Sequence, residues 1–111
     1  MFSVRAAGYT SRAAGEEKAA REHFDRADRY NREADELLET ANGRTFELAR
    51  MHEVADLLDQ KAFGFEQAAQ RYREAVQKID APDYEKAVED AAIYHRAADN
   101  ITIDYSGIDT D

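Results

Sequence analysis

The stretch LARMHEVADLLDQKAFGFEQAAQRYREAVQKI, residues 48–79, decides the fold. Its apolar residues recur at alternating spacings of three and four, which places them on one face of a helix. Further apolar residues beside this stripe widen it, as packing inside a helical bundle requires. We therefore expect one long helix over residues 45–79, whose inner stripe consists of Leu48, Met51, Ala55, Leu58, Ala62, Phe65, Ala69, Tyr72, Val76 and Ile79.

Gly64 lies inside this stripe, and the apolar spacing runs across it without a break. We expect Gly64 to lie within the helix and to permit the close approach of a neighbouring helix, with a turn at Gly64 as the alternative. If no neighbour touches the position of the missing Cβ, replacement of Gly64 by Ala should be neutral or stabilising.

A second stripe precedes residue 42. Ala recurs every seven positions from Ala6 to Ala41, and the position three after each Ala from 6 to 34 carries a larger residue. Small residues on one row let another helix approach closely, while the larger ones fill the space beside it. We expect a helix over residues 5–41, either continuous or interrupted near Gly15. Asn42-Gly43 ends it, and the short connection makes the two long helices antiparallel.

The remaining chain predicts a shorter helix and a tail. Pro82 cannot continue a helix but fits a first turn, so the third helix is expected over residues 83–100. Residues 101–105 then alternate apolar and polar side chains, which is the period of a strand. We expect an extended acidic tail over residues 101–111, laid along an all-α three-helix bundle formed by residues 1–100. A strand offered to the sheet edge of another protein is the alternative for the tail.

Composition excludes several classes of function. The chain has 111 residues, with 15 Lys and Arg against 24 Asp and Glu, for a formal net charge of −9. Such a surface repels nucleic acids and anionic membranes, so we expect neither as a partner. The absence of Cys excludes disulfides and thiolate chemistry. No apolar run is long enough to span a membrane. We expect a cytoplasmic protein, with secretion without a cleavable signal peptide as the alternative.

The histidines do not form a known helical metal motif. Di-iron bundles use Glu-x-x-His, whereas Ala stands three residues before His23, His52 and His95. Phosphate loops, nucleophile elbows and dinucleotide motifs are also missing from the sequence. We therefore expect no catalytic residue, no metal and no cofactor.

Two arrangements of titratable residues nevertheless have a helical spacing. His95 and Asp99 are four residues apart, as are His52 and Asp56, and both pairs are expected to be surface hydrogen bonds, with a shared metal ion as the alternative. Glu16 lies one heptad before His23 on the inner stripe. These two either fix the register of the bundle or lie in a frayed helix end near Gly15; a buried acid/base or metal pair is the alternative.

Residues 15–27, GEEKAAREHFDRA, resemble the second helix of a tetratricopeptide repeat. Residues 64–75 repeat the pattern, and residues 83–87 begin it again. The resemblance covers about half of the chain and implies two helical hairpins with a capping helix, and a protein-binding scaffold without catalysis. The matches are spaced more widely than the family's repeat of about 34 residues. The matching residues of the first segment are Gly8, Gly15, Ala20, Phe24 and Ala27.

The outline of the chain also resembles the small helical-hairpin substrates of type VII secretion. It is acidic and free of Cys, and its expected hairpin turn lies near residue 43. However, Asn42-Gly43-Arg44 stands where that family has Trp-x-Gly. The Asp after Tyr94 is Asp99, which is five residues on and not four. This resemblance implies a secreted protein, which is a lesser alternative.

These patterns together predict a non-catalytic protein–protein interaction module or adaptor that self-associates. Apolar side chains that flank the inner stripes cannot all face one neighbour, so we expect a homodimer and an unidentified protein partner. An acidic inhibitor or nucleic-acid mimic that binds a basic groove on a target is the alternative. The expected interface residues are Phe24, Leu38, Leu57, Phe63, Ile101, Ile103 and Tyr105.

Overall fold

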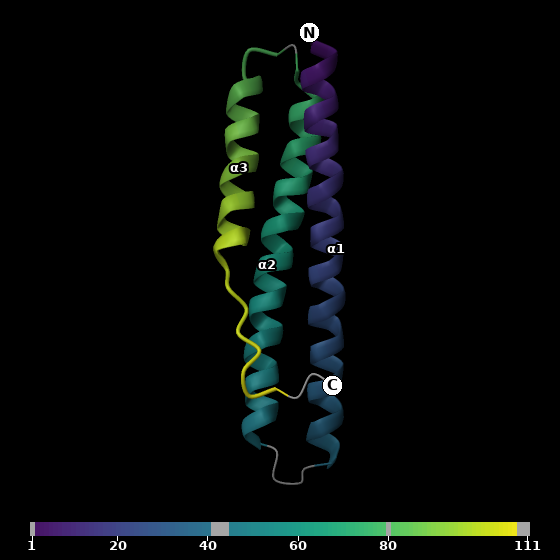
Figure 1. Ribbon diagram of the computed structural model, residues 1–111, viewed down its shortest axis with the longest axis vertical. Coiled ribbons are helices and arrows are strands. Elements are labelled where there is room, and N and C mark those ends of the chain that lie inside the picture. The colour runs from purple at the N-terminus through teal and green to yellow at the C-terminus, as the bar shows by residue number, and fades with distance from the viewer. Residues whose placement is uncertain (1, 41–44, 80, 109–111) are drawn as a thin grey trace.

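The computed structural model describes residues 2–40, 45–79 and 81–108, with side chains over residues 7–38, 47–79 and 81–108. Its helices are α1 (Phe2–Thr40), α2 (Thr45–Gln77) and α3 (Tyr84–Asn100). The molecule is a rod of 61 × 18 × 17 Å, in which α1 and α2 form an antiparallel hairpin and α3 runs back beside α2 (Figure 1). The expected all-α fold with two long helices and a shorter third is confirmed.

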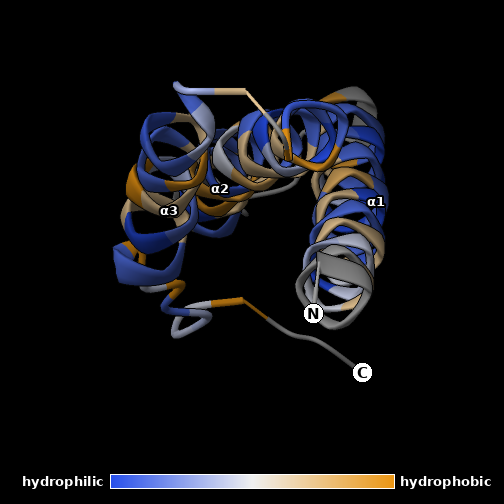
Figure 2. Ribbon diagram, turned by 90° about the horizontal axis from the view of Figure 1, so that it is seen from above, coloured by the Kyte–Doolittle hydropathy of each residue, from blue (hydrophilic) through white to orange (hydrophobic). Residues whose placement is uncertain are grey.

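Helix α2 is the centre of the fold. It contacts both other helices extensively, whereas α1 and α3 approach each other much less. Seen along the rod, α2 lies between α1 and α3 (Figure 2). The expected stripe explains this arrangement, because α2 buries apolar side chains on two sides, including Val54, Leu58 and Phe65.

The Ala row of α1 forms the contact with α2. Ala13, Ala20, Ala27 and Ala34 are each at most 5% exposed, so the two backbones approach closely along the hairpin. The side chains of Ala6 and Ala41 lie outside those that the structure describes. Both α1 and α2 run without a break through their glycines, which lie inside helices. The alternatives of a turn at Gly15 or Gly64, and of two tetratricopeptide-like hairpins, are therefore wrong.

Gly64 lies at a close approach of α2 and α3. A Cβ at this position would lie 2.9 Å from the Cβ of Ala98 and 3.4 Å from its Cα. The interpretation of Gly64 as a residue that permits close packing is thus confirmed. Ala at position 64 is expected to be neutral or stabilising only if no neighbour touches the position of its Cβ. Ala98 of α3 lies against that position, so the condition is not met.

The helix ends differ slightly from the expected ones. Helix α2 ends at Gln77, two residues before the expected end at Ile79. The amide of Lys78 is shared between the carbonyls of Glu74 and Ala75, so the last turn is tighter than a regular α-helical turn. Helix α3 begins at Tyr84, one residue later than expected. The expected helix stop at Asn42-Gly43 lies outside the described residues. No helix in the described part of the chain has the length and apolarity to cross a membrane.

The tail, residues 101–108, continues the path of α3 in extended form (Figure 1). At 1.5 Å per residue α3 is about 25 Å long, roughly half the length of α2. Residues 101–105 are extended and rise about 3.3 Å each, whereas residues 106–108 form a turn. The tail lies along the bundle, as expected, with Ile103, Tyr105 and Ile108 packed against the hairpin.

Candidate functional site

Glu16, His95 and Asp99 form a polar group between α1 and α3, which we call the junction cluster. Nδ1 of His95 is bonded to Oε1 of Glu16, and Nε2 of His95 lies 2.9 Å from Oδ2 of Asp99. The ring of His95 is also edge-on to Phe65 of α2, with centroids 6.1 Å apart. The cluster therefore connects all three helices where α1 and α3 otherwise make few contacts.

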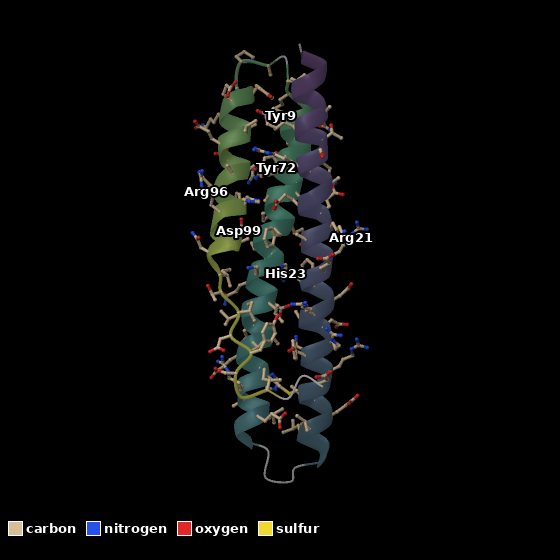
Figure 3. All side chains as sticks on the ribbon, viewed as in Figure 1. Tyr9, Arg21, His23, Tyr72, Arg96 and Asp99 are labelled. Carbon is tan, nitrogen blue, oxygen red and sulfur yellow. The ribbon has the colours of Figure 1, made fainter. Side chains whose placement is uncertain are left out.

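The local sequence explains this placement. Glu16 lies three residues after Ala13, on the row of α1 that faces α3, and it is only 8% exposed. His95 and Asp99 are one turn apart on α3, which brings both side chains to the same edge of that helix. A second contact between α1 and α3 lies nearer the N-terminus of α1, where the rings of Tyr9 and Tyr84 meet edge-on with their centroids 5.5 Å apart. Figure 3 shows Tyr9 and His23 on the inner side of α1 and Arg21 on its outer edge.

Burial is the dominant electrostatic effect on Glu16. It raises the pKa of the carboxyl above its ordinary value, and the charge and hydrogen bond of His95 counteract this only in part. The charge of Asp99 raises the pKa further, whereas that of Arg12 lowers it. The second carboxylate oxygen, Oε2, is buried without a hydrogen-bond partner in the described part of the chain. Glu16 thus favours its protonated form more than an exposed glutamate does.

His23 of α1 lies beside the cluster and is partly buried. Its ring stacks on Phe65, with centroids 5.4 Å apart and an interplanar angle of 6°. Burial lowers the pKa of His23, and the positive charges of Lys61 and Arg26 lower it further. Among the described residues its Nδ1 has no hydrogen-bond partner. Phe65 is therefore sandwiched between the histidine of α1 and that of α3.

The junction cluster places the imidazole of His95 between two carboxylates, with one ring nitrogen within hydrogen-bond distance of each. No Ser, Thr or Cys contacts His95 in the recorded interactions of the described chain. The described residues also contain no group of three or more His, Cys, Asp or Glu that could hold a metal. The junction cluster thus joins α1 to α3 through side chains.

The sequence predicted part of this cluster. The hydrogen bond between His95 and Asp99 is confirmed, although it is not a pure surface contact. The pairing of Glu16 with His23 is wrong, because Glu16 binds His95 of α3. The frayed end near Gly15 is wrong too, since α1 is helical on both sides of it. The connection joins positions 79 residues apart, and no local pattern predicts such a contact.

A different surface holds the exposed apolar side chains of the hairpin. We call it the open face: the side of α1 and α2 that α3 and the tail leave uncovered. On α2, Lys61 and Phe63 flank buried Ala62 on opposite sides, and Lys61 contacts the tail. Phe63, which is 58% exposed, therefore belongs to the open face. Phe24 and Leu38 of α1, 40% and 63% exposed, lie on the row opposite that of Glu16.

A groove between α1 and α2 runs across the open face. Its floor is small and apolar, with Ala20 and Ala69 beside the Phe24 ring. Glu17 of α1 and Arg73 of α2 form an ion pair across it. Arg21 and Glu66 also line the groove, and neither has an ion-pair partner within the described residues. The groove thus carries two acidic and two basic side chains and no net charge.

The other predicted interface residues lie elsewhere. Leu57 is partly buried, on the row of α2 that includes Arg50 and Gly64 and therefore faces the tail and α3. Ile101, Ile103 and Tyr105 are partly buried in the tail, where Ile103 and Tyr105 contact their own hairpin. The structure divides the predicted interface between two sides of the rod. Ile93 of α3, which the sequence did not predict as an interface residue, is 57% exposed.

No family model, curated protein or solved structure matches this chain. The tetratricopeptide resemblance thus has no support from related proteins, and the helices are continuous where that family would turn.

Proposed function

We propose that the chain is a non-catalytic protein-interaction module that self-associates through its open face. The observation that carries the proposal is the exposure of Phe24 and Phe63 on the hairpin side that α3 and the tail leave uncovered. Large aromatic side chains on an otherwise charged surface are typical anchors of protein interfaces. The tetratricopeptide resemblance implies the same general role, but the proposal rests on the exposed side chains alone.

The charge of the open face supports a second copy as the occupant. The whole chain has a formal net charge of −9, so most of its surface repels an identical molecule. The groove beside Phe24 does not share this negative charge, because its two acidic and two basic residues balance. A neutral patch with apolar anchors is a surface on which two copies of an acidic chain can meet. A strongly basic target, as the acidic-inhibitor alternative requires, would gain nothing from this patch.

A two-fold arrangement uses these features well. In an isologous dimer the two copies use the same surface, so every contact between two residues occurs twice. Arg21 of one copy can therefore pair with Glu66 of the second, and Glu66 of the first with Arg21 of the second. Two hairpins joined in this way give a four-helix core, in which the Phe24 and Phe63 side chains fill the centre. The tail and α3 remain on the outside of such a dimer.

The mass in solution tests the proposal. We expect light scattering to give twice the chain mass of 12.6 kDa at micromolar concentration. Replacement of Phe24 and Phe63 by Ser should weaken association by at least about tenfold, since each is an apolar anchor. Ile93→Ser is the matched control, because Ile93 is as exposed as Phe63 but lies on α3. A wild-type chain that stays monomeric over about a hundredfold concentration range would overturn the proposal.

A charge reversal tests the two-fold geometry separately. Arg21→Glu should weaken the dimer, because it places three acidic side chains around the groove. Adding Glu66→Arg to the same chain should restore association, since each copy then again offers one acid and one base. If the double variant keeps its helicity but still does not associate, the pairing of Arg21 with Glu66 is wrong. Such a result would not contradict the role of Phe24 and Phe63 in association.

A further inference from the structure

The tail is held to the hairpin mainly through its backbone. Nζ of Lys61 donates to the carbonyl of Ile101 at 2.8 Å. Arg50 donates to two more carbonyls, from Nη2 to Asp104 at 2.6 Å and from Nε to Ser106 at 2.9 Å. Carbonyl groups are present in any extended chain, so this part of the recognition does not depend on the tail's side chains.

The spacing of these donors fits an extended segment. Arg50 and Lys61 are separated by about three turns of α2, or about 16 Å at 1.5 Å per residue. Asp104 and Ser106 lie three and five residues after Ile101, which at 3.3 Å per residue corresponds to about 10–16 Å of extended chain. A helix at this position would cover less than half of that length with the same residues. The two cations therefore select an extended backbone over a helical one.

Side-chain contacts add a second element of recognition. Ile103, Tyr105 and Ile108 pack against a cluster formed by both long helices, which includes Tyr30 and Val54. The Tyr105 ring lies 5.9 Å from that of Tyr30, and its hydroxyl accepts a hydrogen bond from Arg26 at 3.0 Å. The side chain of Asp104, on the other edge of the tail, lies 3.3 Å from Arg50. Apolar side chains thus enter the hairpin while an acidic one meets the arginine.

The tail lacks the regular backbone hydrogen bonds of a helix or a strand. Its recorded backbone bonds within itself are confined to a turn, in which the amide of Ser106 donates to the Asp104 carboxylate and that of Ile108 to the Tyr105 carbonyl. Gly107 takes the positive φ of 82° that this turn needs. The side chains of residues 101–108 are partly or fully exposed. These are the features of a docked peptide rather than of a core element.

From these contacts we infer that the surface under the tail is a binding site for an extended peptide segment of another protein, which the tail occupies in its absence. The segment that fits has apolar side chains at alternating positions, a tyrosine among them, and an acidic residue that faces Arg50. This site lies on the side of the hairpin opposite the open face, so it is additional to the proposed self-association and can fail independently of it.

The tail competes with any such segment. A covalently attached segment has an effective concentration in the millimolar range, so a free peptide displaces it only when its affinity is higher or the tail is weakened. The full-length variant Ile103→Ser/Tyr105→Ser weakens the tail and leaves every residue of the underlying surface in place. The probe is a fluorescein-labelled synthetic peptide with the sequence of residues 101–108, ITIDYSGI.

Fluorescence anisotropy of this probe tests the inference. We expect the probe to bind the tail-weakened variant at least about tenfold more tightly than the wild type. Adding Arg50→Gln should remove most of this binding, whereas adding Arg96→Gln should not, because Arg96 is exposed on α3 away from the tail. If the double serine variant has lost its helical circular dichroism, Ile108→Ser provides a milder weakening with the same expected order. A helical tail-weakened variant that binds no probe would overturn the inference.

Discussion

Gly64 and Gly15 show how the same residue type has opposite roles at two places in one fold. A Cβ at Gly64 would meet the backbone and Cβ of Ala98, whereas a Cβ at Gly15 would meet nothing within 4 Å. Both residues lie inside helices, where Gly is less favourable than Ala by about 0.5–1 kcal/mol. The environment, and not the helix, therefore decides the effect of an added methyl group.

We predict that Gly64→Ala lowers the free energy of unfolding by about 1–3 kcal/mol, because α3 must move away from α2. Gly15→Ala should instead raise it by about 0.5–1 kcal/mol. Urea denaturation followed by circular dichroism measures both. In the double variant Gly64→Ala/Ala98→Gly the steric conflict is removed, so its loss should be smaller than the sum of the single losses. Equal effects of Ala at the two glycines would contradict the close contact.

Glu16 gives a prediction of pH dependence. Burial raises its pKa above the ordinary value of 4.5, so the folded chain binds this proton more tightly than the unfolded chain does. The stabilisation associated with the protonated carboxyl is complete below about pH 4.5 and is lost as the pH rises through the folded-state pKa. Ionised Glu16 is therefore a cost at neutral pH, which the ion pair with His95 offsets only in part.

We predict that Glu16→Gln is more stable than the wild type at pH 7 by about 1 kcal/mol, because the neutral amide does not carry the buried negative charge of the carboxylate. The difference should shrink as the pH falls toward 4, where wild-type Glu16 is protonated. Denaturation curves at several pH values measure this trend. Glu22→Gln is the control, because Glu22 is exposed on the same helix. A variant less stable than the wild type at pH 7 would mean that the pair with His95 outweighs burial.

At the scale of elements, α3 and the tail cover the same side of the hairpin in different ways. Helix α3 satisfies its own backbone and buries Ala91 and Ala98 against α2. The extended part of the tail, residues 101–105, rises about twice as far per residue as a helix does. Three of its carbonyls, those of Ile101, Asp104 and Ser106, accept hydrogen bonds from Lys61 and Arg50 of α2. The tail thus depends on α2, whereas α3 forms its own hydrogen bonds.

This difference predicts a contrast in amide hydrogen exchange. The amides of residues 102–105 have no recorded intramolecular acceptor in the described chain, so they should exchange close to the intrinsic rate. Amides in the middle of α3 should be protected by orders of magnitude more. Exchange measured by mass spectrometry on overlapping peptides separates the two segments. Strong protection over residues 102–105 would show that the tail pairs with another chain.

At the scale of the whole molecule, charge is unevenly distributed. The chain carries a formal net charge of −9, yet the groove on the open face is balanced. Two copies that meet there bring their remaining negative surfaces within range of each other at low salt. Repulsion between them is screened once the Debye length falls to about 10 Å, near 0.1 M salt.

We therefore predict that self-association strengthens by several fold as salt rises from about 20 mM to about 200 mM. Sedimentation equilibrium at a series of salt concentrations measures this dependence. The Arg21→Glu variant should show a steeper dependence, because it adds negative charge to the contact. An acidic inhibitor bound to a basic target would show the opposite sign, with binding that weakens as salt is added. Weaker self-association at higher salt would argue that ion pairs dominate the interface.

The sequence by itself determined the helices and their inner faces. The spacing of apolar residues in 48–79 predicts α2, its continuity through Gly64 and its burial, because a helix brings residues three and four apart to one side. The Ala row of α1 similarly predicts a close hairpin. The strand-like alternation of residues 101–105 predicts an extended tail. All of these are local patterns, and local geometry is sufficient to interpret them.

Only the tertiary structure decided which faces meet. The pairing of Glu16 with His95, the contact of Gly64 with Ala98 and the carbonyls held by Arg50 each join positions distant in sequence. The division of the predicted interface into an open face and a covered one also depends on which side of the hairpin α3 takes. Helical periodicity predicts whether a side chain is buried or exposed. Which residue it contacts depends on how α1 and α3 pack against α2.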